Sequence, residues 1–85
     1  MKIELQLFGA LRGLAENDTL HLKSCGETID DVRVALAAFA EINWPSTSIA
    51  LLPSCAFASN TSILRGAMPV PEDGRLVVLP PVNGG

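Results

Sequence analysis

The chain ends on Pro80, Pro81, Val82, Asn83, Gly84 and Gly85, and this segment carries the residues best suited to chemistry. Glycine has no Cβ, so a Gly-Gly end is thin enough to enter a narrow channel in another protein. The carboxylate of Gly85 is unhindered, but it is a poor electrophile until it is activated, for example as an acyl-adenylate. Two prolines stiffen the chain before the glycines, so we expect residues 80–85 to project from the fold. The pattern predicts a tail that reacts in a partner's active site, and a frayed terminus is the alternative.

Outside this tail the sequence offers no arrangement of residues that would support catalysis. The one histidine, His21, has no obvious partner and is expected on the surface of a strand. The seven glycines are dispersed, so no phosphate-binding loop is predicted. Cys25 and Cys55 are too few for a disulfide framework and lack the neighbouring ligands of a zinc site. We therefore expect reduced thiols, no metal and no permanently bound cofactor.

Composition limits the classes of protein to which the chain can belong. Its 85 residues favour one domain over 1–85, and an apolar content of 48% suggests that some apolar surface contacts a partner. The net charge is −3 and the six Lys and Arg residues are scattered along the sequence, which argues against binding to nucleic acid or an anionic membrane. The start MKIELQLFG does not resemble a signal peptide, and no apolar run is long enough to span a bilayer, so we expect a cytoplasmic protein.

Alternating polarity predicts two strands near the N-terminus. Residues 2–8 (KIELQLF) place every second side chain on an apolar face, which indicates a half-buried strand. Phe8 breaks the pattern because it falls on the polar side. Residues 19–23 (TLHLK) alternate again, and the short connection 9–17, with room for one helical turn, favours an antiparallel pair.

One clear helix is predicted over residues 28–42. Thr28 is a candidate N-cap, and Asp31 provides a carboxylate version of the capping box. Asn43 and Pro45 end the helix. The apolar stripe expected to face the core consists of Ile29, Val32, Ala35, Leu36 and Phe39.

Residues 46–67 are the least regular part of the sequence. The stretch 49–52 (IALL) fits either a short strand or a loop segment that lies on the core, and Pro53 is awkward for a strand. The stretches 55–59 and 62–64 predict a hairpin, because a turn sequence joins them.

The last predicted strand, residues 75–80 (RLVVLP), is apolar on both faces. Because one helix covers one face only, we expect this strand at the centre of the sheet with its outer face left for a partner. The order of elements predicts an α+β fold of the β-grasp type: a mixed, mostly antiparallel sheet with one main helix packed across it.

Over nearly its whole length the chain resembles the MoaD-type sulfur carriers, the small subunits of molybdopterin synthase. The specific part is residues 72–85 (EDGRLVVLPPVNGG), in which an acidic-glycine turn and an apolar strand precede Pro-Pro-Val-x-Gly-Gly. Residues 3–17 (IELQLFGALRGLAEN) are similar too, with a strand that ends in an aromatic residue. Arg75 and Gly13 depart from the resemblance, because the family often has an acidic residue at each position.

The resemblance implies a ubiquitin-like fold and chemistry at Gly85. An E1-like adenylyltransferase would use ATP to adenylate the carboxylate, and a sulfur donor enzyme would convert the adenylate to a thiocarboxylate. The tail, Pro80 to Gly84, would then enter the large subunit of molybdopterin synthase, where Gly85 would donate sulfur to cyclic pyranopterin monophosphate. The family suggests a heterotetramer, with the acid–base residues on the large subunit.

A partner interface is expected beside the tail. If the first and last strands are neighbours, Phe8, Val77 and Leu79 lie together on the face opposite the helix-covered core. An exposed apolar patch of this kind is typical of a surface on which a partner docks.

Three other functions stay open. A carrier for another pathway, such as a thiamine-type carrier, shares the Gly-Gly end, although those carriers are usually shorter and lack the Pro-Pro-Val run. A protein modifier would join the same activated carboxylate to lysine by an isopeptide bond. An interaction domain with an inert tail is the last alternative.

Overall fold

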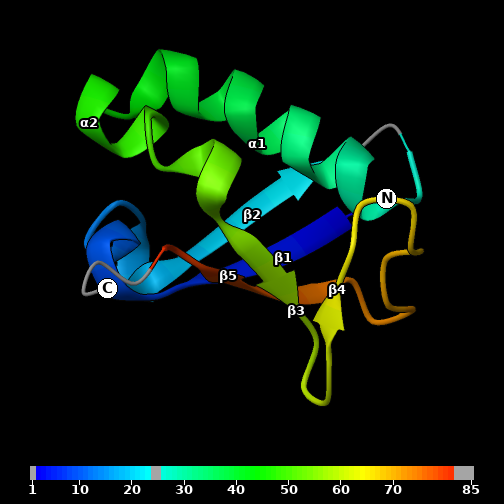
Figure 1. Cartoon of the computed structure of the whole chain (residues 1–85). Coiled ribbons are helices and arrows are strands. Elements are labelled where there is room, and N and C mark those ends of the chain that lie inside the picture. Colours follow the sequence, from blue (N-terminus) through cyan, green and yellow to red (C-terminus); the bar gives the residue numbers. More distant parts are fainter. Residues whose placement is uncertain (1, 24–25, 82–85) are drawn as a thin grey trace.

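A computed structural model of the chain describes residues 2–23 and 26–81. Within these residues five strands form one mixed sheet in the order β2-β1-β5-β3-β4, and one long helix crosses it (Figure 1). In chain order, with η for a 3-10 helix, the elements are β1 (Lys2–Leu7), η1 (Gly9–Leu11), η2 (Glu16–Asp18), β2 (Thr19–Lys23), α1 (Ile29–Asn43), α2 (Ser46–Ile49), η3 (Leu52–Ser54), β3 (Ala56–Ala58), β4 (Ile63–Leu64) and β5 (Arg75–Leu79). The α+β, β-grasp arrangement is confirmed.

The central strands are β1 and β5, as the sequence predicted for the last strand. Alternate residues of β1 (Ile3, Leu5 and Leu7) are buried, because they point toward the helical layer. β1 pairs antiparallel with β2 and parallel with β5, so the first and last strands are neighbours. β1 ends one residue earlier than predicted, and Phe8 continues the extended backbone up to η1.

Helix α1 begins with the predicted capping box. The Thr28 hydroxyl accepts a hydrogen bond from Asp31 N at 3.3 Å, and the Asp31 carboxylate accepts one from Thr28 N at 3.1 Å. The Thr28 hydroxyl also donates to the Asp31 carboxylate at 2.9 Å. The hydrogen bonds that the backbone N–H and the hydroxyl of Thr28 donate to this carboxylate lower the pKa of Asp31. The ionised Asp31 carboxylate therefore stabilises the fold fully at pH values above its pKa in the unfolded chain. This stabilisation is lost as the pH falls through the lower pKa that Asp31 has in the native protein.

The buried stripe of α1 differs from the predicted one at two places. Ala35 is half-buried and is not part of the core, and the C-terminal end of the stripe also differs. Ala40 is fully buried there, whereas Phe39 is half-buried. Phe39 instead packs edge-on against Trp44, with ring centroids 6.3 Å apart. The stripe thus continues by a step of four residues from Leu36, and the bulky ring closes the edge of the core.

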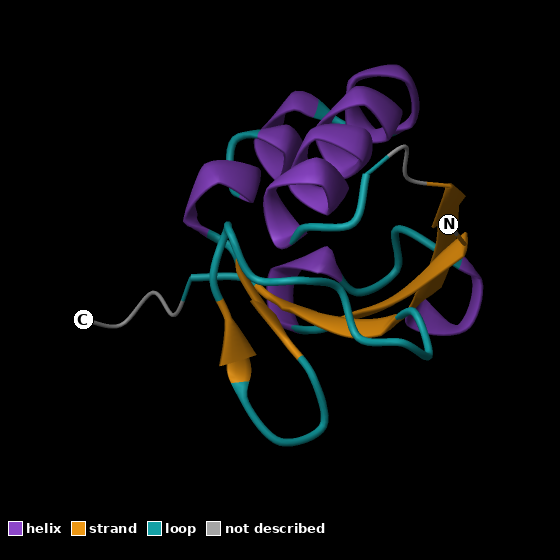
Figure 2. Cartoon of the chain, turned by 90° about the vertical axis from the view of Figure 1, so that its right-hand side faces the viewer, coloured by secondary structure: helices purple, strands orange, loops and turns teal. Residues whose placement is uncertain are grey.

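Residues 46–54 form helical turns, and the strand considered for 49–52 is wrong. α2 and η3 lie on the same side of the sheet as α1 (Figures 1 and 2). Leu52 is buried at this point, and Pro53 lies in the first turn of η3, where a missing N–H costs no helical hydrogen bond. The predicted hairpin follows, with β3 antiparallel to β4.

Arg33 explains why this segment folds back onto α1. Its Nη1 donates to the carbonyl oxygens of Leu52 at 3.3 Å and Cys55 at 3.0 Å. Its guanidinium carbon also lies 4.8 Å from the centroid of the Phe57 ring, within the range of a cation–π contact. These partners are about twenty residues away in the sequence, so no local pattern predicts the contact.

The core lies between the inner face of the sheet and the helices. It includes the inward residues of β1 and β5, the buried stripe of α1, and Phe57 from β3. In the part of the chain that the structure describes, no helix has the length and apolar character needed to cross a bilayer.

Thr28→Ala is expected to lower the free energy of unfolding by about 1 kcal/mol, because it removes the hydroxyl from the capping box. Urea denaturation followed by circular dichroism measures the change. Thr61→Ala, in an exposed turn, is the matched control and should change stability by less than about 0.5 kcal/mol. Equal losses in the two variants would show that the cap contributes nothing specific.

Candidate functional site

The tail begins where the central strand β5 ends, at Leu79. Pro80 is half-buried and Pro81 is exposed, so the chain leaves the fold within two residues. The remaining predicted site residues, Val82, Asn83, Gly84 and Gly85, lie outside the described residues. The described part of the site is therefore the base of the tail and the surface around it.

Gly9 fixes the position of the tail base. Its φ is +56°, which favours glycine, and a Cβ at this position would lie 2.9 Å from Cγ of Pro80. The end of β5 accordingly lies beside η1 in Figure 1. The positive φ and the close approach of the Pro80 ring to the Gly9 backbone thus favour glycine here. This contact joins residues far apart in the sequence, so no local pattern predicts it.

Phe8, Val77 and Leu79 lie on the outer face of the sheet, away from α1. Leu7 and Val78 are aligned in the parallel pair and are both buried, so the next residues, Phe8 and Leu79, face the other way side by side. Phe8 is 39% exposed, whereas Val77 and Leu79 are half-buried. The structure therefore brings the three predicted interface residues together next to the base of the tail.

Two further residues extend this surface. Ala56 aligns with Leu79, and both point outward because Phe57 and Val78 point into the core. Ile63 of β4 aligns with Ala58 and is 62% exposed. Alternation in residues 55–64 would have predicted both, had the strand bounds been clear. We name Phe8, Ala56, Ile63, Val77 and Leu79 the apolar patch.

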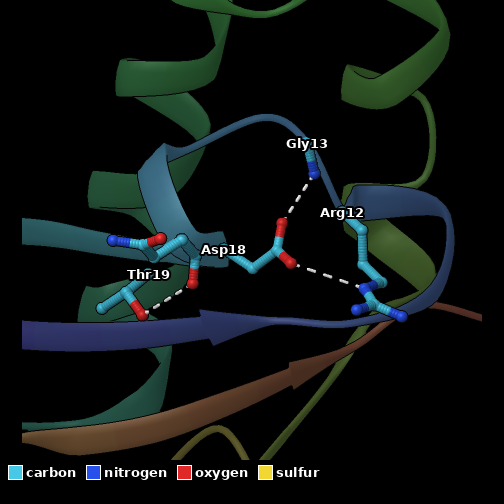
Figure 3. Close-up of polar contacts among 5 residues, drawn as sticks. Arg12, Gly13, Asp18 and Thr19 are labelled. Carbon is cyan, nitrogen blue, oxygen red and sulfur yellow. Dashed lines mark hydrogen bonds and ion pairs between the residues drawn. The ribbon is translucent and has the colours of Figure 1, made fainter.

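Asp18 closes the loop that follows η1. Figure 3 shows its carboxylate between the backbone N–H of Gly13, at 2.7 Å, and Nε of Arg12, at 3.4 Å. The Gly13 hydrogen bond is the main cause of a lowered pKa for Asp18, and Arg12 adds to it. These two contacts are strongest while Asp18 is ionised. They therefore weaken as the pH falls through the pKa of Asp18 in the native protein.

The described residues contain no group of three His, Cys, Asp or Glu side chains that could hold a metal ion. His21 is exposed on β2, as predicted. Cys55 is a buried free thiol whose Sγ donates to Leu51 O at 3.3 Å. Burial raises the pKa of Cys55, although the Arg33 charge opposes this, so the thiol is poorly suited to nucleophilic chemistry. Cys25 lies outside the described residues.

A mixed sheet with parallel central strands, one helix across one face, and a glycine-ended segment after the central strand defines a ubiquitin-like protein of the β-grasp class. The chain belongs to the ThiS family, whose model matches residues 5–85. This family consists of ubiquitin-like sulfur carriers of the ThiS and MoaD type, which partner with sulfurtransferase-type enzymes. A search of curated proteins found no match.

Gly9→Ala is expected to destabilise the fold by more than Gly13→Ala and to displace the base of the tail. Both glycines have positive φ, at +56° and +88°, so both variants carry backbone strain of about 1 kcal/mol. A new Cβ at Gly9 also meets Pro80, whereas one at Gly13 has no atom within 4 Å.

Urea denaturation measures the stability difference, and the amide resonance of Leu79 in NMR spectra reports on the tail base. We expect this resonance to shift in the Gly9 variant and to stay in place in the Gly13 variant. Equal stability losses with an unmoved Leu79 resonance would contradict a positioning role for Gly9.

Proposed function

We propose that the chain is the sulfur carrier subunit of molybdopterin synthase and acts in the cytoplasm. The supporting observation is that Pro80 leaves the central strand directly beside the apolar patch, in a chain that continues as Pro-Val-Asn-Gly-Gly. A partner that covers the patch would thus receive the tail in a fixed direction. The Pro-Pro-Val run favours the molybdopterin pathway within the family.

Gly85 is the reacting residue in this proposal. Its carboxylate attacks the α-phosphate of ATP on an E1-like adenylyltransferase, which forms an acyl-adenylate and releases pyrophosphate. A hydrosulfide equivalent (HS⁻) delivered by a donor enzyme then attacks the acyl carbon and displaces AMP, which leaves a thiocarboxylate. In the large subunit, cyclic pyranopterin monophosphate takes the sulfur, and water returns Gly85 to a carboxylate.

In these reactions the carrier positions the reacting Gly85 carboxylate in the active site of its partner. The partner enzymes provide the acid–base groups. Residues Pro80 to Gly84 insert the tail into each active site in turn, while the apolar patch holds the folded part at the entrance. The assembly with the large subunit is a heterotetramer in this proposal. ATP is a substrate of the activating enzyme, and the carrier itself needs no cofactor.

A carrier of the thiamine type is the second candidate, because the family match over residues 5–85 includes carriers of both types. The two functions differ in the acceptor that receives the sulfur. Incubation of the thiocarboxylated chain with molybdopterin synthase large subunit and cyclic pyranopterin monophosphate separates them, because formation of molybdopterin requires the first function.

Intact mass spectrometry of the chain from its own cells should reveal a form about 16 Da heavier, because one carboxylate oxygen is replaced by sulfur. Fragmentation should place the change on Gly85, and a variant that lacks Gly85 should not acquire it. If the chain carries only a free carboxylate, even after incubation with ATP, an E1-like enzyme and a sulfur donor, the sulfur carrier function is wrong. Conjugates with lysine would instead indicate a protein modifier.

Phe8→Asp is expected to weaken binding to the large subunit by about tenfold or more, because it places a charge on the apolar patch beside the base of the tail. Stability should change by less than about 0.5 kcal/mol, since Phe8 is already 39% exposed. Val34→Asp is the matched control: it is 71% exposed on α1, on the other side of the sheet. Calorimetric titration and urea denaturation give the two quantities.

Loss of several kcal/mol of stability in the Phe8 variant would identify Phe8 as a core residue, because burying an unpaired charge is costly. Equal loss of binding in the Val34 control would place the interface elsewhere.

A further inference from the structure

Three of the six Lys and Arg residues, scattered along the sequence, meet on the outer face of the sheet. Lys2 of β1 aligns with Lys23 of β2, and Glu4 of β1 aligns with both His21 and Arg75. All five residues fall on the outer face, because their neighbours in the strands point into the core. Lys23, at the end of β2, also borders a hollow beside α1. Three cations that are far apart in the sequence are therefore near one another in the structure.

These residues surround a solvent-open concavity of about 560 Å³ at the end of the sheet opposite the tail. Lys2, His21, Lys23 and Arg75 are all exposed there. Asp73 completes the charged lining. We name this feature the cationic concavity.

The concavity has positive charge that the described part of the chain does not neutralise. Its lining contains three cations and two carboxylates, which gives it a net charge of +1. The net charge of the whole chain is −3, so the remaining residues carry −4. Glu4 is already paired, with its Oε2 3.6 Å from Nε of Arg75. Asp73 accepts from the backbone N–H of Arg75 at 3.0 Å.

The two lysines are left in an unfavourable arrangement. Lys2 and Lys23 are aligned across neighbouring strands, and like charges in this position are destabilising. Among the described residues, the ion pairs are Arg12 with Asp18 and Arg75 with Glu4, so neither lysine has a carboxylate partner there. A negatively charged group above the sheet would relieve this repulsion.

The cationic concavity is continuous with the apolar patch. A smaller hollow of about 160 Å³ lies between them on the same face. It shares Glu4 and Arg75 with the concavity and Val77 with the patch. A partner that covers the patch and extends along the sheet thus reaches the lysines.

We propose that the cationic concavity docks a carboxylate-rich surface of the protein that also covers the apolar patch. This inference rests on the proposed function, and the protein meant is the E1-like adenylyltransferase of that proposal. A protein surface suits the feature better than a small phosphate ligand, because the cations are exposed and spread over three strands. Opposed charges of this kind chiefly accelerate association and set the orientation of the partner.

Binding to hexaglutamate tests the concavity without any assumed partner. In NMR titrations of the full chain at low salt, we expect saturable shifts confined to Lys2, His21, Lys23 and Arg75. The double variant Lys2→Gln, Lys23→Gln should lose them, whereas Arg65→Gln, an exposed cation elsewhere, should keep them. If hexaglutamate causes no localised shifts, the proposal is wrong. If inorganic phosphate binds more tightly at the same residues, the concavity is a site for a small anion instead, and the proposal is again wrong.

Association with the E1-like adenylyltransferase then separates this inference from the proposed function. The double variant Lys2→Glu, Lys23→Glu should slow association on the order of tenfold at low salt, with the difference shrinking as salt rises. Arg65→Glu is the control. If neither the unmodified chain nor any variant is adenylated, the proposed function is wrong. If all are adenylated, and the Lys2→Glu, Lys23→Glu variant associates as fast as the Arg65→Glu control, only the inference about the concavity is wrong.

Discussion

The parallel pairing of β1 with β5 is the contact on which the rest of the structure depends. It aligns residues 4–7 with 75–78 and so joins the two ends of the chain at the centre of the sheet. The alignment of Leu7 with Val78 brings Phe8 beside Leu79 and Gly9 against Pro80. At the other end, the same register brings Arg75 against Glu4. The tail base therefore depends directly on this strand pair, and the apolar patch and the cationic concavity are each completed by the strands that flank it, β3 with β4 and β2.

The second constraint is that the helices cover one face of the sheet only. Apolar side chains on the inner face are buried under α1, whereas Phe8 and Ile63 remain exposed on the outer face. Part of the 48% apolar content therefore lies on the outer face of the sheet and outside the core. Polar and charged residues occupy the outer face toward the far end, so the face changes character along the strands.

For a sulfur carrier, this architecture separates placement from chemistry. The described residues hold a buried, unreactive Cys55 and an exposed His21, and they provide no catalytic group. The fold instead sets where the chain leaves the sheet, through the contact between Gly9 and Pro80. Asp18 holds the loop after η1 and so supports the element that carries Gly9.

The sequence by itself determined the features that depend on neighbouring residues. Alternation predicted β1 and β2, and the Thr28 cap predicted the start of α1. The assignment of the reactive group to Gly85 also comes from the sequence and stays a prediction. The tertiary structure decided the rest: helical turns at 46–54, the need for glycine at Gly9, and the meeting of Lys2 with Lys23 and Arg75. The physical reason is that caps and periodicity act over a few residues, whereas these contacts join segments about twenty or more residues apart and form only when the sheet closes.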